Sequence, residues 1–347
     1  MHAYIVRRLL AMIPMFFIMT GVLFIILDKL PGGPVQEALA RIRGSDGGGG
    51  GGGSGRNVSM STEEIAKLRA ELEKQYGLDK PVIVRYLNWV KSIVILDFGD
   101  SITTRQPAMD TIVSRFPVSL GFGIPGFFLT YLICVPLGVA KALKDGGKFD
   151  IISSVGLFIV YSIPPLVISI VMLLVFCTDR VLPSGAIFPL GGFRSDSFSE
   201  MSLFGQIGDY IYHMFLPVCA SLIGGFTVTT LLMKNSLLEV IRSDYVRTAR
   251  AKGLGENFII YKHALRNAIL PLMVGIGGFL STFVAGSVII EAVFGLPGMG
   301  LLFLEAITAR DYNVFMGVQV LISLSIMFGQ LFSDMAYVIV DPRIDFN

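Results

Sequence analysis

The densest group of charged side chains next to apolar sequence lies in residues 234–266. Seven basic residues stand there against three acidic ones: Lys234, Arg242, Arg247, Arg250, Lys252, Lys262 and Arg266 against Glu239, Asp244 and Glu256. Burying one such charge at the centre of a bilayer costs roughly 2.5–3.5 kcal/mol. Because long apolar runs flank this stretch on both sides, we expect it to lie in water against a membrane face.

Within this stretch the sequence predicts a short helix that ends at Gly253. Ser243 and Asp244 are residue types that begin helices, and Arg250 and Lys252 place cations in the last turn. Gly253 can take the left-handed conformation that follows a helix C-terminus. The alternative is a solvated basic loop that obeys the positive-inside rule.

Other patterns that could do chemistry are missing from the sequence. No GxxxxGK[ST] phosphate-binding pattern occurs: Gly147-Lys148 is followed by Phe149, and the glycine tract 47–53 has no Lys-Ser or Lys-Thr after it. No HExxH helix or buried Ser-His pair is visible for proteolysis, and no ring of charges suggests a selective channel. Any ATP hydrolysis would therefore come from another polypeptide.

The composition indicates an integral membrane protein. Hydrophobic residues make up 53% of the 347 and charged residues 16%, against roughly 25% charged in soluble domains, and the mean hydropathy is +0.70. The net charge of +2 gives no support to nucleic-acid binding. Cys134, Cys177 and Cys219 lie inside apolar runs, so we expect packing residues and neither disulfides nor metal ligands.

Six apolar runs are each long enough to cross a hydrocarbon core of about 30 Å. They cover residues 9–27, 116–140, 151–178, 210–233, 267–290 and 312–333. A secretory signal is the alternative for the first run, but its apolar core is usually about 7–15 residues long. No Asp, Glu, Lys or Arg lies within the six runs, which disfavours an ion-coupled secondary transporter. His213, near one end of the fourth run, is expected at headgroup level.

The connections between these runs predict the orientation. Thirteen Lys or Arg residues fall on one side, counting both ends of the chain, and three fall on the opposite short connections. Both termini are therefore expected in the cytoplasm. The long polar region 28–115 is expected outside, with a flexible Gly-rich linker at 45–55, a capping box at Ser61–Glu64 and an amphipathic stretch around Trp89.

Residues 245–253 read YVRTARAKG, and HALRNA at 263–268 and Leu270-Pro271 follow. This pattern resembles the cytoplasmic coupling loop of ABC-importer permeases, in particular their dipeptide and oligopeptide branch. The broad family consensus has Glu-Ala-Ala where this chain has Arg247, Thr248 and Ala249. The resemblance implies that the following residues contact an ATPase subunit: Tyr245, Arg247, Thr248, Ala249, Arg250, Ala251, Lys252 and Gly253.

A second motif, EAVFGLPGMG at residues 291–300, resembles a run found after the fifth span of peptide and nickel permeases. The resemblance marks Glu291, Phe294, Pro297, Gly298 and Gly300 as a loop or gate motif on the periplasmic side. A purely architectural glycine-rich turn is the alternative. Residues 96–101 and 340–345 also resemble peptide permeases, and the chain as a whole looks most like the Yej-type oligopeptide permeases.

The resemblance implies an all-α membrane protein with six transmembrane helices of the type I ABC importer permease fold. It divides the chain into segments 1–27, 28–115, 116–333 and 334–347, with the coupling loop at 234–266. It also implies a bacterial inner-membrane location and, as partners, a second permease subunit, two ATPase subunits that bind ATP and Mg²⁺, and a periplasmic peptide-binding protein. No cofactor is expected in this chain, which would not be an enzyme. A nickel or metal-chelate permease is the alternative.

Overall fold

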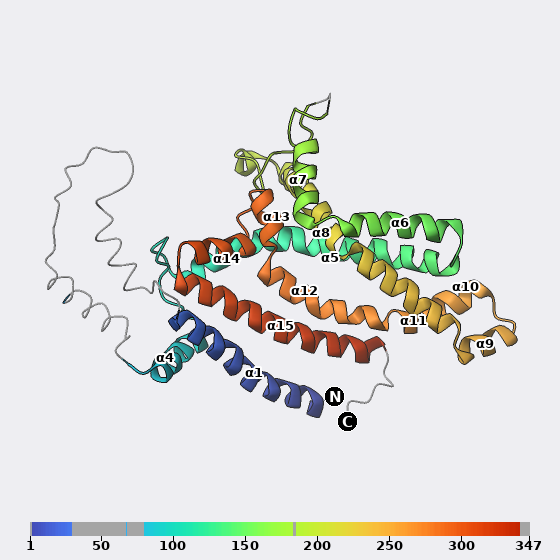
Figure 1. The fold of residues 1–347 in the computed structure, drawn as a ribbon, viewed down its shortest axis with the longest axis horizontal. Coiled ribbons are helices and arrows are strands. Elements are labelled where there is room, and N and C mark those ends of the chain that lie inside the picture. The colour runs from blue at the N-terminus through green and yellow to red at the C-terminus, as the bar shows by residue number, and fades with distance from the viewer. Residues whose placement is uncertain (1, 30–66, 68–79, 183–184, 341–347) are drawn as a thin grey trace.

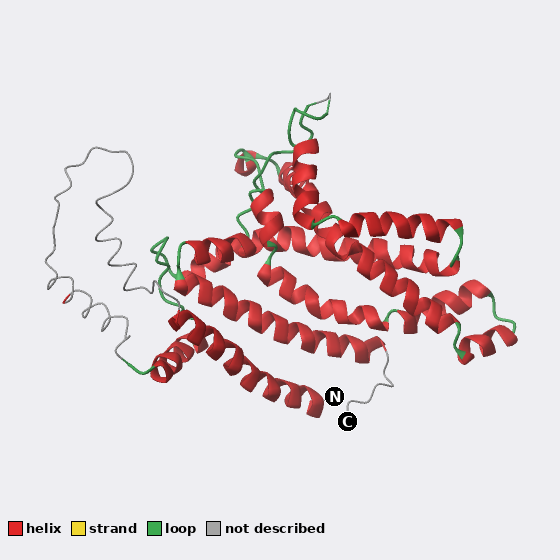
Figure 2. Ribbon diagram, in the orientation of Figure 1, coloured by secondary structure: helices red, strands yellow, loops and turns green. Residues whose placement is uncertain are grey.

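The computed structural model describes residues 2–29, 67, 80–182 and 185–340. These residues form helices joined by turns (Figure 2), together with one isolated antiparallel bridge between Asp100 and Pro107. The glycine tract 47–53, the capping box at 61–64 and the C-terminal residues 341–347 lie outside the described part of the chain.

The elements follow one another from the N-terminal α1 to the C-terminal α15 (Figure 1). Their bounds are α1 His2–Lys29, α4 Val82–Val94, α5 Ala108–Leu143, α6 Lys148–Ser162, α7 Pro165–Phe176, η1 Phe198–Glu200, α8 Leu203–Ile241, α9 Asp244–Ala251, α10 Glu256–Phe258, the π-helix η2 Ile259–Ala264, α11 Leu265–Ala268, η3 Leu270–Leu272, α12 Met273–Ala285, α13 Val288–Val293, α14 Met299–Thr308 and α15 Tyr312–Val340.

Four of the described helices, α1, α5, α8 and α15, are long and apolar enough to cross a membrane. The expected span 151–178 is instead two helices, α6 and α7, which meet at an angle of 94°. Ile163 and Pro164 are both extended between them, because a residue that precedes proline is driven out of the helical region. The pair counts as a fifth span only if it is taken as one broken crossing.

The expected span 267–290 is also interrupted. Pro271 lies in the short 3₁₀ turn η3, α12 begins only at Met273, and the chain leaves the helical region again at Gly286, where φ is +63°. Proline lacks the amide hydrogen that would continue the helix. The count of six continuous spans is thus not reached in the described residues, whereas the prolines inside α5 and α8 leave those helices unbroken.

Small residues set the closest helix crossings. A Cβ on Gly138 of α5 would lie 2.6 Å from the Cβ of Met233 in α8, and one on Gly277 of α12 would lie 2.6 Å from the carbonyl oxygen of Gly329 in α15. Gly138 and Gly277 thus allow the helix backbones to approach closely. Gly224 faces open space, so it does not serve this purpose.

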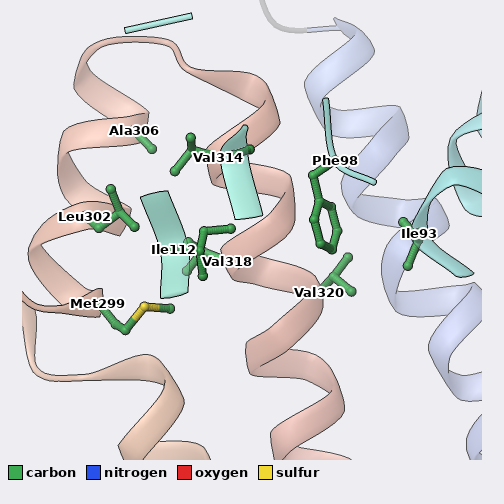
Figure 3. Packing of buried hydrophobic residues seen from close by; sticks show 10 residues of the cluster. Ile93, Phe98, Ile112, Met299, Leu302, Ala306, Val314, Val318 and Val320 are labelled. Atoms are coloured by element: carbon green, nitrogen blue, oxygen red, sulfur yellow. The ribbon is translucent and has the colours of Figure 1, made fainter. Parts of the chain in front are cut away.

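A buried cluster joins α14 and α15 to α5 and to the turn after α4 (Figure 3). In this view Ile112 of α5 lies beside Val318 of α15, with Leu302 of α14 on one side and Phe98 on the other. The turn that carries Phe98 is further fixed by Asp311, because the Asp311 carboxylate accepts a hydrogen bond of 2.5 Å from the Ser101 hydroxyl. The 96–101 motif thus packs against the start of α15.

Candidate functional site

The short basic helix expected before Gly253 is present as α9. It begins at Asp244 after an extended Ser243, although the Ser243 hydroxyl donates back to the Val240 carbonyl and does not cap an amide of α9. At the other end Gly253 has φ of +75°. Its amide donates to the Arg250 carbonyl, and the amide of the next residue donates to Ala249. These two bonds form a Schellman motif, so the predicted end of the helix is confirmed.

One face of α9 is anchored in the membrane-spanning bundle. Val246 is fully buried and belongs to a cluster that also holds Val139 of α5, Leu237 of α8 and Ile259 of η2. A fully buried valine side chain stabilises its position by about 1.5–3 kcal/mol. A displacement of α9 therefore has to move or deform the ends of α5 and α8 that pack against it, because closely packed interiors resist deformation.

The rest of the α9 surface and the helix end at Lys252 are open and basic. Arg247, Thr248, Arg250, Ala251 and Lys252 are exposed. Within the described residues, Lys252 has no ion-pair partner, and the Arg247 pair with Asp244 at 3.3 Å is almost fully in solvent. Such exposed pairs contribute little to stability, so these charges remain available to a partner.

The segment after α9 carries its own ion pair and aromatic rings. Arg250 donates to Glu256 at 3.1 Å through Nε, and this guanidinium holds the pKa of the Glu256 carboxyl below its usual value. Phe258 is 45% exposed, and the Lys262 ammonium lies 4.6 Å from the centre of its ring. Tyr245 accepts a hydrogen bond of 2.8 Å from Asn267. The open face therefore combines cations with exposed aromatic surface.

The second predicted motif encloses a buried carboxylate. Glu291 of α13 is fully buried, and its carboxylate accepts hydrogen bonds from the Ser119 hydroxyl at 3.0 Å, the Ser287 amide at 3.0 Å and the Leu301 amide at 2.7 Å. The Ser119 oxygen in turn accepts from the Met299 amide at the start of α14. A carboxylate is well placed at a helix N-terminus because the unpaired amides there carry partial positive charge.

The glycines of this motif make room for the carboxylate and for the chain itself. A Cβ on Gly300 would lie 2.5 Å from the Val288 amide nitrogen, and one on Gly298 would overlap the Glu291 carboxylate. Phe294 is buried in the apolar cluster formed with α5, α7 and α8, and Pro297 is half-buried. The polar atoms of the motif are thus paired with other parts of the same chain.

The residues predicted to contact an ATPase lie together, and so do those of the Glu291–Gly300 motif, but the two groups are far apart in the structure (Figure 1). The α9 residues lie at the end of the bundle that also holds the α5–α6 turn, and the Glu291 motif lies beside α7 and α14. Sequence reasoning missed Ser119, because a serine in an apolar run 172 positions before Glu291 carries no local signal. It also missed the anchoring role of Val246, for which the one available signal was an apolar residue inside a basic run.

These features define a helical membrane protein with a basic, solvent-exposed helix held at one end of its bundle. Residues 134–346 match the family described as "Binding-protein-dependent transport system inner membrane component", and the chain belongs to this family. It is a permease subunit of an ABC transporter and not itself an enzyme. The resemblance drawn from the coupling-loop motif is confirmed.

The chain is similar over its whole length to several permeases. It is 37% identical to "Inner membrane ABC transporter permease protein YejB" of Escherichia coli O157:H7, with 100% of each chain covered. It is 37% identical to "Peptidoglycan transport system permease protein YejB" of Agrobacterium fabrum, covering 100% of this chain and 99% of the relative. It is 32% identical to "Oligopeptide transport system permease protein AppB" of Bacillus subtilis, with 100% of each covered.

Proposed function

We propose that this chain forms one half of the translocation path of an ATP-driven peptide importer and that α9 is the surface on which an ATPase subunit docks. The observation that carries the proposal is that α9 has one buried side and one exposed, basic side. Val246 ties one face to α5 and α8, while Arg247 and Lys252 leave the other side basic and open. A partner that moves α9 would thereby move the inner ends of the membrane helices.

Peptide cargo is supported by the printed names of the relatives, which include oligopeptide and dipeptide permeases. Cargo contacts along the path would be weak, because a wall that binds peptide tightly would not release it. The spans would rock between inward-open and outward-open arrangements as the ATPases close and open.

The proposed arrangement has six membrane crossings, in which α6–α7 and the interrupted segment 265–285 each complete one pass. Both termini and α9 lie on the cytoplasmic side, and the region 28–115 lies outside. The α5–α6 turn and α9 lie at one end of the bundle, and α1 begins toward that same end (Figure 1). This arrangement supports the orientation, as does the excess of Lys and Arg there.

The complete transporter would contain a second permease subunit, two ATPase subunits that bind ATP and Mg²⁺, and a periplasmic peptide-binding protein. Each permease would present one coupling loop to one ATPase subunit. The Glu291–Gly300 motif, at the other end of the path from α9, would hold the outer opening in shape.

The test is to reverse the two most available cations of α9. In the double variant Arg247→Glu, Lys252→Glu we expect roughly tenfold less ATPase to co-purify with this chain in detergent, because opposed like charges at an interface cost several kcal/mol. The matched control is Lys91→Glu, Arg180→Glu, which makes the same charge change at exposed positions outside the coupling loop. Full recovery of the ATPase with the α9 double variant would refute the docking surface.

A further inference from the structure

A fully buried lysine lies directly behind the coupling loop. Lys141, in the last turn of α5, has no solvent-exposed side-chain surface. Its ammonium lies 3.0 Å from the Asp150 carboxylate and donates to the hydroxyls of Ser153 and Ser154 at 2.7 and 2.8 Å. It also donates to the Asp150 carbonyl at 2.9 Å. All of these partners belong to α6, so Lys141 binds α5 to α6.

A second lysine joins the same carboxylate from the other side. Lys234 of α8 lies 2.6 Å from the second Asp150 oxygen and 2.9 Å from Asp145 in the α5–α6 turn. The Gly146 amide donates to Asp150 as well. Two cations and two anions thus balance each other, and Asp150 is the group that both lysines share. The cluster connects α5, the turn, α6 and α8.

Burying ion pairs is a poor way to stabilise a fold, because desolvation cancels most of the Coulombic gain. The place of this cluster in the molecule suggests a different role. Val139 and Ala142, on either side of Lys141 in sequence, and Met233, next to Lys234, belong to the apolar cluster that buries Val246 of α9. The same short segments of α5 and α8 therefore hold α9 on one side and the ion cluster on the other.

Helix α6 depends on polar contacts for its attachment. Asp150 and Leu157 are its buried residues, and the Leu157 carbonyl accepts a hydrogen bond of 2.9 Å from Thr227 of α8. Its outer face is apolar and exposed, as at Ile152 and Ile159. The turn that joins it to α5 contains Gly146 with φ of +70° followed by Gly147. Such a turn can bend, so the covalent link alone does not fix α6.

We propose that Lys141, Asp150 and Lys234 form a clamp that makes α6, and with it the bent pair α6–α7, move as one body with the coupling loop. These are positioning residues that act through α9 and contact neither cargo nor nucleotide. The inference rests on the proposed docking of an ATPase at α9 and adds the route by which that movement reaches the third membrane segment. Without the clamp, α8 and α5 would still follow α9, but α6 would lag at its glycine turn.

The first experiment compares three variants of the complete transporter in proteoliposomes, with uptake of a labelled peptide and ATP hydrolysis measured together. Lys234→Met should lower peptide uptake per ATP by about tenfold, within the range of typical coupling energies, while the ATPase still co-purifies and hydrolyses ATP. Lys234→Arg keeps both ion pairs and should restore coupling. Lys148→Met, which removes an exposed lysine at the start of α6, should behave as the wild type.

The second experiment measures the movement of α6 directly, and its first comparison uses the unaltered clamp. Spin labels at Glu239→Cys and Ile159→Cys, both exposed positions, are introduced after Cys134, Cys177 and Cys219 are replaced by serine. The distance between the labels should be the same with and without ATP in the otherwise wild-type transporter. It should change between the two states in Lys234→Met and stay constant in Lys234→Arg.

The outcomes separate the two proposals. A label distance that shifts with ATP while Lys234 is present, or full coupling in Lys234→Met, overturns the clamp and leaves the docking at α9 intact. Failure of the wild-type chain to recover any ATPase overturns the docking surface itself. Loss of coupling in Lys234→Met together with rescue by Lys234→Arg supports the clamp over a merely structural role.

Discussion

The coupling loop and the Glu291 motif both contain charged side chains, which are exposed in the first region and buried in the second. On α9, Arg247 and Lys252 extend from the protein surface, and the nearest acid to Arg247 is itself in solvent. At the motif, Glu291 is fully buried and receives three hydrogen bonds from elsewhere in the chain. Available charges are what an interface needs, whereas satisfied buried charges fix a backbone.

Gly253 in the first region and Gly300 in the second also differ in how closely other parts of the chain pack against them. Gly253 needs its left-handed φ of +75°, but beyond its chain neighbours no atom of the described residues comes within 4 Å of the place a Cβ would take there. Gly300, in contrast, is in close contact with the backbone at Val288. The first glycine therefore shapes a helix end, and the second allows two chain segments to touch. On the function proposed above, the first region serves docking and the second serves architecture, and four changes test this difference.

The largest effect is expected from Gly300→Val. Its Cβ would lie 2.5 Å from the Val288 nitrogen and 2.8 Å from the Ser287 carbonyl carbon, which are backbone atoms that cannot rotate away. We expect a loss of about 3 kcal/mol or more in stability, measured as the thermal midpoint of the detergent-solubilised protein. Gly208→Val is the control, since open space surrounds Gly208. Equal midpoints for the two variants would mean that the motif is not tightly packed.

Glu291→Ala should have the next largest effect. It leaves the Ser287 and Leu301 amides and the Ser119 hydroxyl without their acceptor, at a cost of about 3 kcal/mol. Glu291→Gln keeps one acceptor oxygen and should cost less. Both effects are read from the thermal midpoint together with peptide uptake. Normal stability combined with lost uptake in Glu291→Ala would reverse the comparison and give the carboxylate a direct role in transport.

Gly253→Val should act locally. A β-branched residue in the left-handed region costs about 1–2 kcal/mol, which should distort the end of α9 and leave the spanning helices in place. We expect membrane insertion and thermal midpoint close to the wild type, with ATP hydrolysis no longer coupled to uptake. Gly253→Asn is the control, because asparagine tolerates this conformation. Unchanged transport in the valine variant would remove the coupling role from this helix end.

The smallest effect is expected at the exposed pair Arg250–Glu256. Exposed ion pairs contribute less than about 1 kcal/mol, so Glu256→Gln should barely move the thermal midpoint at pH 7. Because Arg250 lowers the pKa of Glu256, the stabilisation is complete above the usual glutamate pKa and is lost as the pH falls through the lowered value. Midpoints of the wild type and Glu256→Gln should therefore converge in acid. A large difference at pH 7 would show that this pair is structural.

Much of the molecule could be predicted from local sequence. The apolar runs predicted α1, α5, α8 and α15, since a bilayer core requires helices of a known length whatever their neighbours are. The end of α9 at Gly253 followed from helix-capping chemistry, which involves only the backbone of adjacent residues. The resemblance of the coupling motif to that of ABC-importer permeases indicated the family, which the family match then confirmed.

What the sequence alone determined, then, were the features that depend on a few neighbouring residues: helix length, helix ends and motif identity. The bend between α6 and α7, the pairing of Ser119 with Glu291 and the burial of Lys141 against Asp150 were decided by the tertiary structure. Lys141 directly follows the apolar run 116–140, and nothing near it in sequence shows that Lys234 would meet the same carboxylate. Contacts between residues that are far apart along the chain exist only once the helices pack, and packing decides whether a charge faces water or another charge.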